Sequence, residues 1–217
     1  MTEKTAILLD LDGTIIDASE SITKTARLAM RQHGVEPPES DDMLHLIGPP
    51  FASTFRDYYN LDEETSWKVT ETYRDMYGRE GVYNCTLYDG VGDLIKGLKD
   101  QGKKVLLATS KPVVYARIIL EHLKLLIYFD ALGGPPMKGD FSKADAIRMA
   151  MKEAGVAGLN AAVQVGDRHY DINGAREVGI DSIGVLYGFG SKEELVNAGA
   201  TLIVEDIPAL GKALGVW

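Results

Sequence analysis

The stretch Ile7-Leu8-Leu9-Asp10-Leu11-Asp12-Gly13-Thr14 decides the fold. The apolar run over residues 5–9 predicts a buried parallel strand, which the Gly-Thr pair ends. Because side chains alternate faces along a strand, Asp10 and Asp12 leave its end on the same side. Two carboxylates held so close repel, so they need a cation or a shared proton, or one carboxylate tunes the other. An acidic turn without function is the alternative.

The end of that strand is also where a ligand would bind. Ligands of open α/β sheets lie at the carboxyl ends of the strands. We therefore predict a site for a hard cation, favouring Mg²⁺, with one aspartate free to attack an electrophile.

Composition narrows the function further. The chain has 217 residues, enough for one good core or for one core domain with a small second domain. Its 45% hydrophobic and 25% charged residues are typical of an ordinary soluble protein. The net charge of −9 argues against a nucleic acid polymer or a membrane as the main partner. Cys85 is the single cysteine, so no internal disulfide can form. We see no signal peptide and no membrane-spanning run, and expect a cytoplasmic protein.

Helical patterns follow the first strand without a strand signal from Asp17 to about Gly81. They predict helices that begin at Ser19 or Ser21 and end near Gly34, and further helices over 41–47, 51–59 and 63–77. We therefore divide the chain into a core domain, residues 1–16 and 86–217, and an inserted helical domain, residues 17–85.

Strands and helices alternate after Leu87. This order predicts an α/β fold, a doubly wound parallel sheet with right-handed crossovers. The strands are expected over 104–108, 128–132, 161–165, 181–185 and 201–204, and the helices over 91–101, 112–123, 142–154, 171–178, 192–198 and 207–214.

Two more sites with positive or hydroxyl groups lie at strand ends or helix starts. Thr109 and Ser110 end a strand, where a hydroxyl and backbone N–H groups predict a phosphate site, with plain helix capping as the alternative. Lys111 adds positive charge there. Lys143 stands at a helix N-terminus, where the helix dipole disfavours a cation, so we predict that it reaches back to a phosphate and to Asp10. Lys138 is the competing lysine.

The last acidic motif is Val163-Gln164-Val165-Gly166-Asp167-Arg168-His169-Tyr170-Asp171. Asp167 is a third carboxylate at a strand end. Asp171 is either a fourth carboxylate of the same group or only an acid in the first turn of the next helix. Acids that converge on one sheet edge need a divalent cation, and oxygen ligands favour Mg²⁺ over Zn²⁺. We expect His169 to point away from them.

In order and context these motifs resemble the haloacid dehalogenase superfamily of phosphohydrolases, over essentially the whole chain. The resemblance rests on Asp-Leu-Asp-Gly-Thr at residues 10–14, Thr109, Lys143 and Gly-Asp-Arg-His-Tyr-Asp at residues 166–171. The helical insertion looks like the C1 cap of that superfamily.

Within the superfamily the chain is similar to the phosphoglycolate phosphatase-like branch. Residues 47–50, 87–91 and 187–191 fit a subgroup often labelled 5′-nucleotidase-like. Phosphoglycolate phosphatases usually have Pro-Gly at the position of Asp89-Gly90 and Thr-Asn-Lys at that of residues 109–111.

The resemblance implies a role for each residue. Asp10 would be the nucleophile that forms an aspartyl-phosphate, and Asp12 the general acid and base. Asp10, the backbone carbonyl of Asp12 and Asp167 would hold Mg²⁺, with Asp171 acting through water or an outer contact. The phosphoryl oxygens would meet Thr109 and backbone N–H groups near Ser110 and Gly13, and Lys143 would balance the charge.

The implied function is a phosphatase for a small phosphorylated metabolite, with a nucleoside monophosphate as the candidate. Phosphoglycolate phosphatase and a phosphomutase on the same scaffold are the alternatives. A dehalogenase needs neither Mg²⁺ nor Asp12, and a receiver domain lacks the helical insertion. Gly48 and Pro49 are expected in the cap loop that meets the leaving group, with hinges at 16–19 and 81–87. We expect a monomer, or a homodimer through cap tyrosines that otherwise form the cap core: Tyr58, Tyr59, Tyr73 and Tyr77.

Overall fold

The computed structural model describes residues 1–49, 51–137 and 141–217. The chain divides into two compact units, one of residues 1–17 and 87–217 and the other of residues 18–86. Pro50 and Lys138, which the sequence analysis considered, lie outside the described residues.

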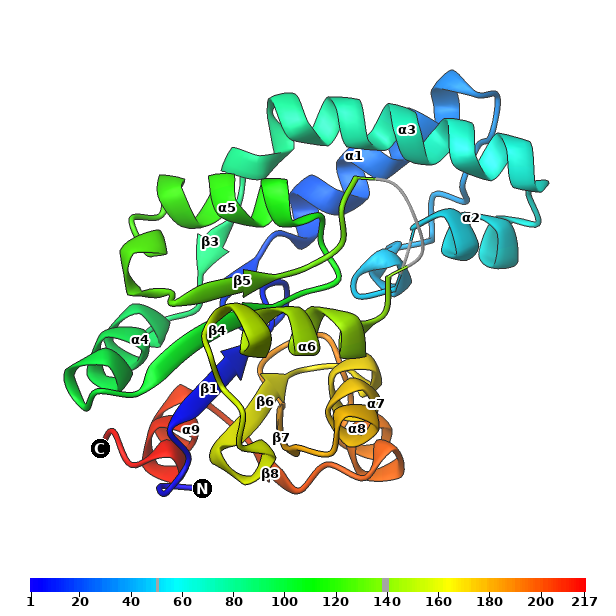
Figure 1. The fold of residues 1–217 in the computed structure, drawn as a ribbon. Helices are drawn as coiled ribbons and strands as arrows, with labels where there is room; N and C mark the ends of the chain where they lie inside the picture. The colour runs from blue at the N-terminus through cyan, green and yellow to red at the C-terminus, as the bar shows by residue number, and fades with distance from the viewer. Residues whose placement is uncertain (50, 138–140) are drawn as a thin grey trace. The chain divides into compact units, whose positions relative to one another are not determined.

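A six-stranded parallel sheet forms the centre of the first unit (Figure 1). Its strand order is β5-β4-β1-β6-β7-β8, so β1 (Ala6–Leu9) lies between β4 (Lys104–Ala108) and β6 (Ala162–Gly166). The other strands are β5 (Ala131–Gly133), β7 (Asp181–Val185) and β8 (Leu202–Val204). The predicted fold class, a doubly wound α/β sheet with an inserted helical segment, is confirmed.

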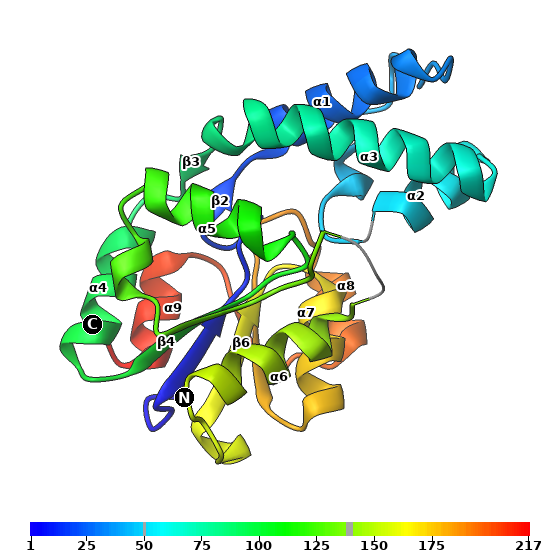
Figure 2. The ribbon, with the colours of Figure 1, turned by 45° about the horizontal axis from the view of Figure 1, so that its top comes forward.

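Both faces of the sheet are covered, which explains why its central strands are mostly apolar, with Lys104 at the start of β4 and Gln164 in β6 as the polar members. All four residues of β1 are buried, and Ala6 and Leu8 join a core cluster with α6 (Lys143–Glu153) and α7 (His169–Val178). On the other face α4 (Val91–Asp100) packs against α9 (Ile207–Leu214) (Figure 2). The helices α5 (Val113–His122) and α8 (Lys192–Ala198) also belong to this unit.

The second unit consists of helices. Its longest helix, α3 (Glu63–Arg79), packs against both α1 (Ser19–Gln32) and α2 (Phe51–Tyr59). Two 3₁₀ turns lie at η1 (Leu44–Leu46) and η2 (Gly81–Tyr83). No helix of the described residues is long and apolar enough to cross a membrane.

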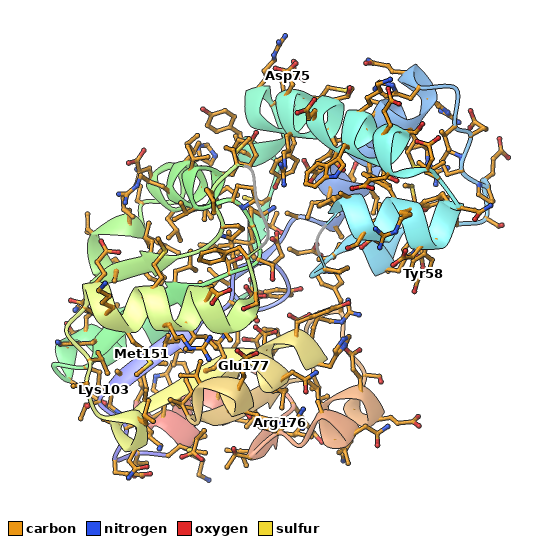
Figure 3. All side chains as sticks on the ribbon, turned by 45° about the vertical axis from the view of Figure 1, so that its right-hand side comes forward. Tyr58, Asp75, Lys103, Met151, Arg176 and Glu177 are labelled. Atoms are coloured by element: carbon orange, nitrogen blue, oxygen red, sulfur yellow. The ribbon has the colours of Figure 1, made fainter. Side chains whose placement is uncertain are left out.

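The tyrosines of this unit separate into core and surface. Tyr73 and Tyr77 are buried and stack with ring centroids 5.4 Å apart, so they belong to the unit's own core. Tyr59 donates a hydrogen bond to Asp41 at 2.6 Å. Tyr58 is 66% exposed and projects from the side of the unit away from Asp75 (Figure 3).

Three local predictions differ from the structure. The helix expected over 41–47 is reduced to the single turn η1, because Met43 has a left-handed φ of 58° and donates its N–H to the Asp41 side chain. The strand expected over 128–132 begins only at Ala131, after the 3₁₀ turn η3 (Leu126–Tyr128). A two-stranded ribbon of β2 (Ile16–Asp17) and β3 (Thr86–Leu87), too short to leave a sequence pattern, was missed.

Gly133→Ala tests the packing of β5 on α6. A Cβ at Gly133 would overlap the carbonyl oxygen of Ala146, and that helix backbone cannot move aside cheaply. We expect the free energy of unfolding to fall by about 1–3 kcal/mol. Gly92→Ala is the control, because a Cβ there meets open space in a helix and is expected to be neutral or to stabilise by up to ~1 kcal/mol. Urea unfolding of both variants measures this, and equal stability would contradict the contact.

Candidate active site

Three polar residues predicted for the site directly follow three adjacent strands. Asp10 follows β1, Thr109 follows β4 and Asp167 follows β6. The register pairs Leu9 with Leu107 on one side and with Val165 on the other, so the three strands end at one sheet edge. Strands β4 and β5 lie on one side of β1, and strands β6, β7 and β8 lie on the other. Open α/β sheets bind ligands at the point where the strand order reverses in this way.

Lys143 is the buried countercharge of the carboxylates at this edge. Its Nζ lies 2.8 Å from Asp10 Oδ1 and 2.9 Å from Asp171 Oδ1, and it donates to the carbonyl of Ala108 at 3.1 Å. Burial alone would lower the pKa of Lys143, but Asp10 and Asp171 outweigh it and raise that pKa. Ser142 caps the helix that begins at Lys143, so the lysine is fixed at its root.

Asp12 has a lysine of its own. Lys111 Nζ lies 3.2 Å from Asp12 Oδ2, and both side chains are largely buried. Burial raises the pKa of Asp12, Lys111 opposes that rise, and Asp10 adds to it. The sequence placed Lys111 beside an anion, and in the structure that anion is the carboxylate of Asp12.

Thr109 does not cap a helix. It is buried, and its Oγ1 accepts the N–H of Lys111 at 3.1 Å. Helix α5 begins later, at Val113, with Pro112 in the capping position. The alternative interpretation of Thr109 and Ser110 as helix caps is therefore wrong.

Asp167 is fully buried and only half satisfied. Its Oδ2 accepts the backbone N–H of Phe189 at 2.8 Å. Its Oδ1 is buried and has no hydrogen-bond partner among the described residues. Burial raises its pKa well above the usual range, and the nearby Asp171 and Asp10 add to the effect, while the Phe189 N–H opposes it.

Asp171 serves both its helix and the cluster. It lies in the first turn of α7, where Oδ2 accepts the N–H of Arg168 at 3.2 Å, and Oδ1 faces Lys143. Gln164, which the sequence analysis did not single out, donates to the same Oδ1 at 3.1 Å from inside β6. Burial raises the pKa of Asp171 to about 6, against the lowering effect of Lys143.

The remaining predicted residues lie around or outside this cluster. Gly13 has a φ of 83°, and a Cβ there would overlap the carboxylate of Asp167. His169 Nδ1 lies 2.7 Å from Glu194 Oε1, and His169 is not part of the carboxylate cluster. Gly48 and Pro49 belong to the helical unit, so their contact with a leaving group stays a prediction.

The carboxylates fit a divalent cation. Asp10, Asp167 and Asp171 each offer an oxygen, and these oxygens lie within 4.8 Å of one another. If all four carboxyl groups are ionised, including Asp12, their four negative charges exceed the charges of the two lysines by two in this part of the described structure. Oxygen ligands, two excess charges and the unsatisfied Asp167 Oδ1 suit a hard divalent ion.

Asp171→Asn tests the raised pKa. Because the folded-state pKa lies above the ordinary 3.8, the folded state binds more protons at this group, and stability falls as pH rises from about 4 through about 6. We expect the stability of the wild type minus that of Asp171→Asn to decrease over this interval. Urea unfolding at several pH values, with EDTA present, measures it. A difference that is constant or rises with pH would contradict the raised pKa of Asp171 and the dominance of burial over its ion pair with Lys143.

Comparison with known proteins finds relatives over the whole chain. A 5′-nucleotidase of Pseudomonas aeruginosa is 35% identical over 209 residues, which span 96% of this chain and 94% of that protein. The tyrosine-protein kinase PtkA of Mycobacterium tuberculosis is 32% identical over 213 residues, 97% of this chain and 72% of the kinase. The crystal structure of a predicted phosphatase from Clostridium acetobutylicum has a TM-score of 0.93 at 40% identity and matches 99% of both chains.

The match to a family model is as broad. The model described as haloacid dehalogenase-like hydrolase matches residues 7–185, from the first strand to the end of β7. It therefore includes the four carboxylates, both lysines and the helical unit. The resemblance predicted from the motifs is confirmed, and the chain belongs to the haloacid dehalogenase-like hydrolase family.

Proposed function

We propose that this protein is a Mg²⁺-dependent phosphomonoester hydrolase that acts through an aspartyl-phosphate on a small phosphorylated metabolite. One observation carries the proposal: Asp10, paired with Lys143, lies with Asp167 and Asp171 at the strand end next to Thr109. A nucleophile, a countercharge and a cation site at one sheet edge suit phosphoryl transfer.

In the first step a carboxylate oxygen of Asp10 forms a bond to phosphorus, and the bond from phosphorus to the leaving alcohol breaks. Asp12, whose pKa burial raises, gives its proton to the departing alkoxide. Bound Mg²⁺, held by Asp10, the Asp12 carbonyl and Asp167, would shield the anionic nucleophile from the anionic phosphate. Thr109 and backbone N–H groups near Ser110 and Gly13 would bind the phosphoryl oxygens.

In the second step water replaces the alcohol. Asp12 takes a proton from the water, whose oxygen attacks phosphorus, and the bond from phosphorus to Asp10 breaks to release inorganic phosphate. Asp10 and Asp171 raise the pKa of Lys143, and Asp171 remains its carboxylate neighbour while Asp10 carries the phosphoryl group. Lys143 therefore balances the Asp10 carboxylate before the first step and after the second.

The relative named a 5′-nucleotidase supports a nucleoside monophosphate as the substrate. Phosphoglycolate is the alternative, although Asp89 and Ser110 depart from the pattern of phosphoglycolate phosphatases. Transfer to an acceptor other than water, as in a phosphomutase or as the name of the kinase relative implies, is the second candidate. The role of the helical unit as a cap, a monomeric or dimeric state and a cytoplasmic location stay predictions.

Phosphate release tests the chemistry. We expect Mg²⁺-dependent release from at least one of nucleoside monophosphates, phosphoglycolate, sugar phosphates and pyrophosphate. Asp10→Asn should lower kcat by at least about 10³-fold, because it removes the nucleophile. Asp93→Asn, an equally conservative change at an exposed position of α4, is the control and should leave kcat unchanged.

The outcomes separate the candidates. Release that persists in Asp10→Asn would refute the proposed nucleophile. If no phosphate is released from any substrate and the phosphoryl group is instead transferred to a sugar or a tyrosine, the protein is a transferase and not a hydrolase.

A further inference from the structure

The segment Tyr187–Glu194 follows β7 and runs beside the acidic motif that follows β6. We propose that this segment, here called the positioning segment, holds Asp167 so that one carboxylate oxygen is occupied and the other is presented to the cation. The inference rests on the metal site of the proposed function. It assigns a role to residues outside the predicted catalytic set.

A backbone hydrogen bond fixes the first oxygen. Phe189 N–H donates to Asp167 Oδ2 at 2.8 Å, whereas Oδ1 is buried without a hydrogen-bond partner among the described residues. The two oxygens of one carboxylate are therefore distinguished before any ligand arrives. Oδ1 is the oxygen available to a cation shared with Asp10 and Asp171.

Two glycines allow the backbone to come this close. A Cβ at Gly188 would overlap the carbonyl oxygen of Gly13 and lie 2.6 Å from Asp167 Oδ2. A Cβ at Gly190 would overlap the carbonyl oxygen of Asp167 and lie 3.3 Å from Arg168 Cδ. Any larger residue at either position pushes the segment away from Asp167.

The ends of the positioning segment are anchored separately. Tyr187 donates its hydroxyl to the carbonyl of Thr14 at 3.0 Å, and its ring meets Tyr88 edge-on at 5.0 Å. Burial raises the pKa of Tyr187, so the hydroxyl keeps the proton that it donates. The segment thus joins the turn after β1 to the loop after β6.

Glu194 holds the residues that follow Asp167. Its Oε1 accepts from Arg168 Nε at 2.9 Å and from the backbone N–H of His169 at 2.8 Å, and it lies 2.7 Å from His169 Nδ1. Glu194 is itself fixed in the first turn of α8, where its N–H donates to Ser191 Oγ. Asp167 is therefore restrained through its side chain and through the backbone on its C-terminal side.

The expected consequence is higher metal affinity. Groups that orient a metal ligand without touching the metal typically contribute 10–100-fold to affinity. A displaced positioning segment would free the Asp167 carboxylate to rotate, and the cation would then have to order it. Asp167 Oδ1 has no hydrogen-bond partner among the described residues, so turning it away breaks no hydrogen bond, and metal affinity should change more than the stability of the metal-free protein.

Calorimetric titration with Mg²⁺ tests the inference on four variants of the full chain. Asp167→Ala, which removes the ligand, should abolish binding. Gly188→Ala should weaken binding by about 10–100-fold, and Glu194→Gln, which keeps the shape but removes the charge, should weaken it measurably. Gly92→Ala is the matched control and should bind like the wild type, because its Cβ meets open space. The Tm of each metal-free variant separates affinity from stability.

The results distinguish a failure of the proposed metal site from a failure of the positioning role. If the wild type binds no Mg²⁺, the metal site of the proposed function fails, and the inference fails with it. If the wild type binds and both Gly188→Ala and Glu194→Gln bind equally well, only the positioning role is refuted. A lower Tm with an unchanged Kd also refutes that role. If Gly188→Ala does not fold, Glu194→Gln decides.

Discussion

Four carboxylates share one edge of the sheet with two buried lysines, and this concentration of charge governs the architecture around it. Removing an ion from water is costly, so each lysine must lie within ion-pair distance of a carboxylate. Lys143 meets this need from the start of α6, against the direction of the helix dipole, and Lys111 from the loop after β4. Small residues complete the edge, since a Cβ at Gly166 would overlap the carboxyl group of Asp171.

The charges at this edge lower the stability of the folded state, and the burial of apolar side chains in the rest of the sheet offsets that loss. The pKa values of Asp12, Asp167 and Asp171 are all raised, so the folded state tolerates their charges rather than gaining from them. The neighbouring strands are mostly apolar and buried, and the burial of their apolar side chains stabilises the fold a few residues away from the acids. A site that is electrostatically strained before its ligand arrives is typical of functional centres, where stability is exchanged for reactivity.

Sequence predicted most of the fold and the gathering of the acids, because both follow from simple rules. Central parallel strands are continuous apolar runs, and residues that end adjacent strands must meet, as Asp10 and Asp167 do. The contacts that the sequence did not predict involve backbone groups, or side chains that contact residues far away in the sequence. The Phe189 N–H that binds Asp167 has no signature in residue type, and neither the pairing of Lys111 with Asp12 nor the contact of Glu194 with residues 168–169 follows a local spacing. The spaced glycines at 188 and 190 were the only signal of that close approach.

The position of β1 has a consequence for the order in which the chain acquires structure. Leu8 pairs with Leu106 on one side and with Gln164 on the other, and both partners come after the helical insertion. On the ribosome, therefore, the strand made first cannot form a sheet hydrogen bond until β4 has emerged, and its second edge stays open until β6 follows. The contacts among α1, α2 and α3 join segments much closer in sequence, and such contacts form faster. β1, whose residues are all buried in the folded chain, therefore stays unpaired on one edge until β6 emerges, and during synthesis its apolar side chains are among those that a nascent-chain chaperone would shield.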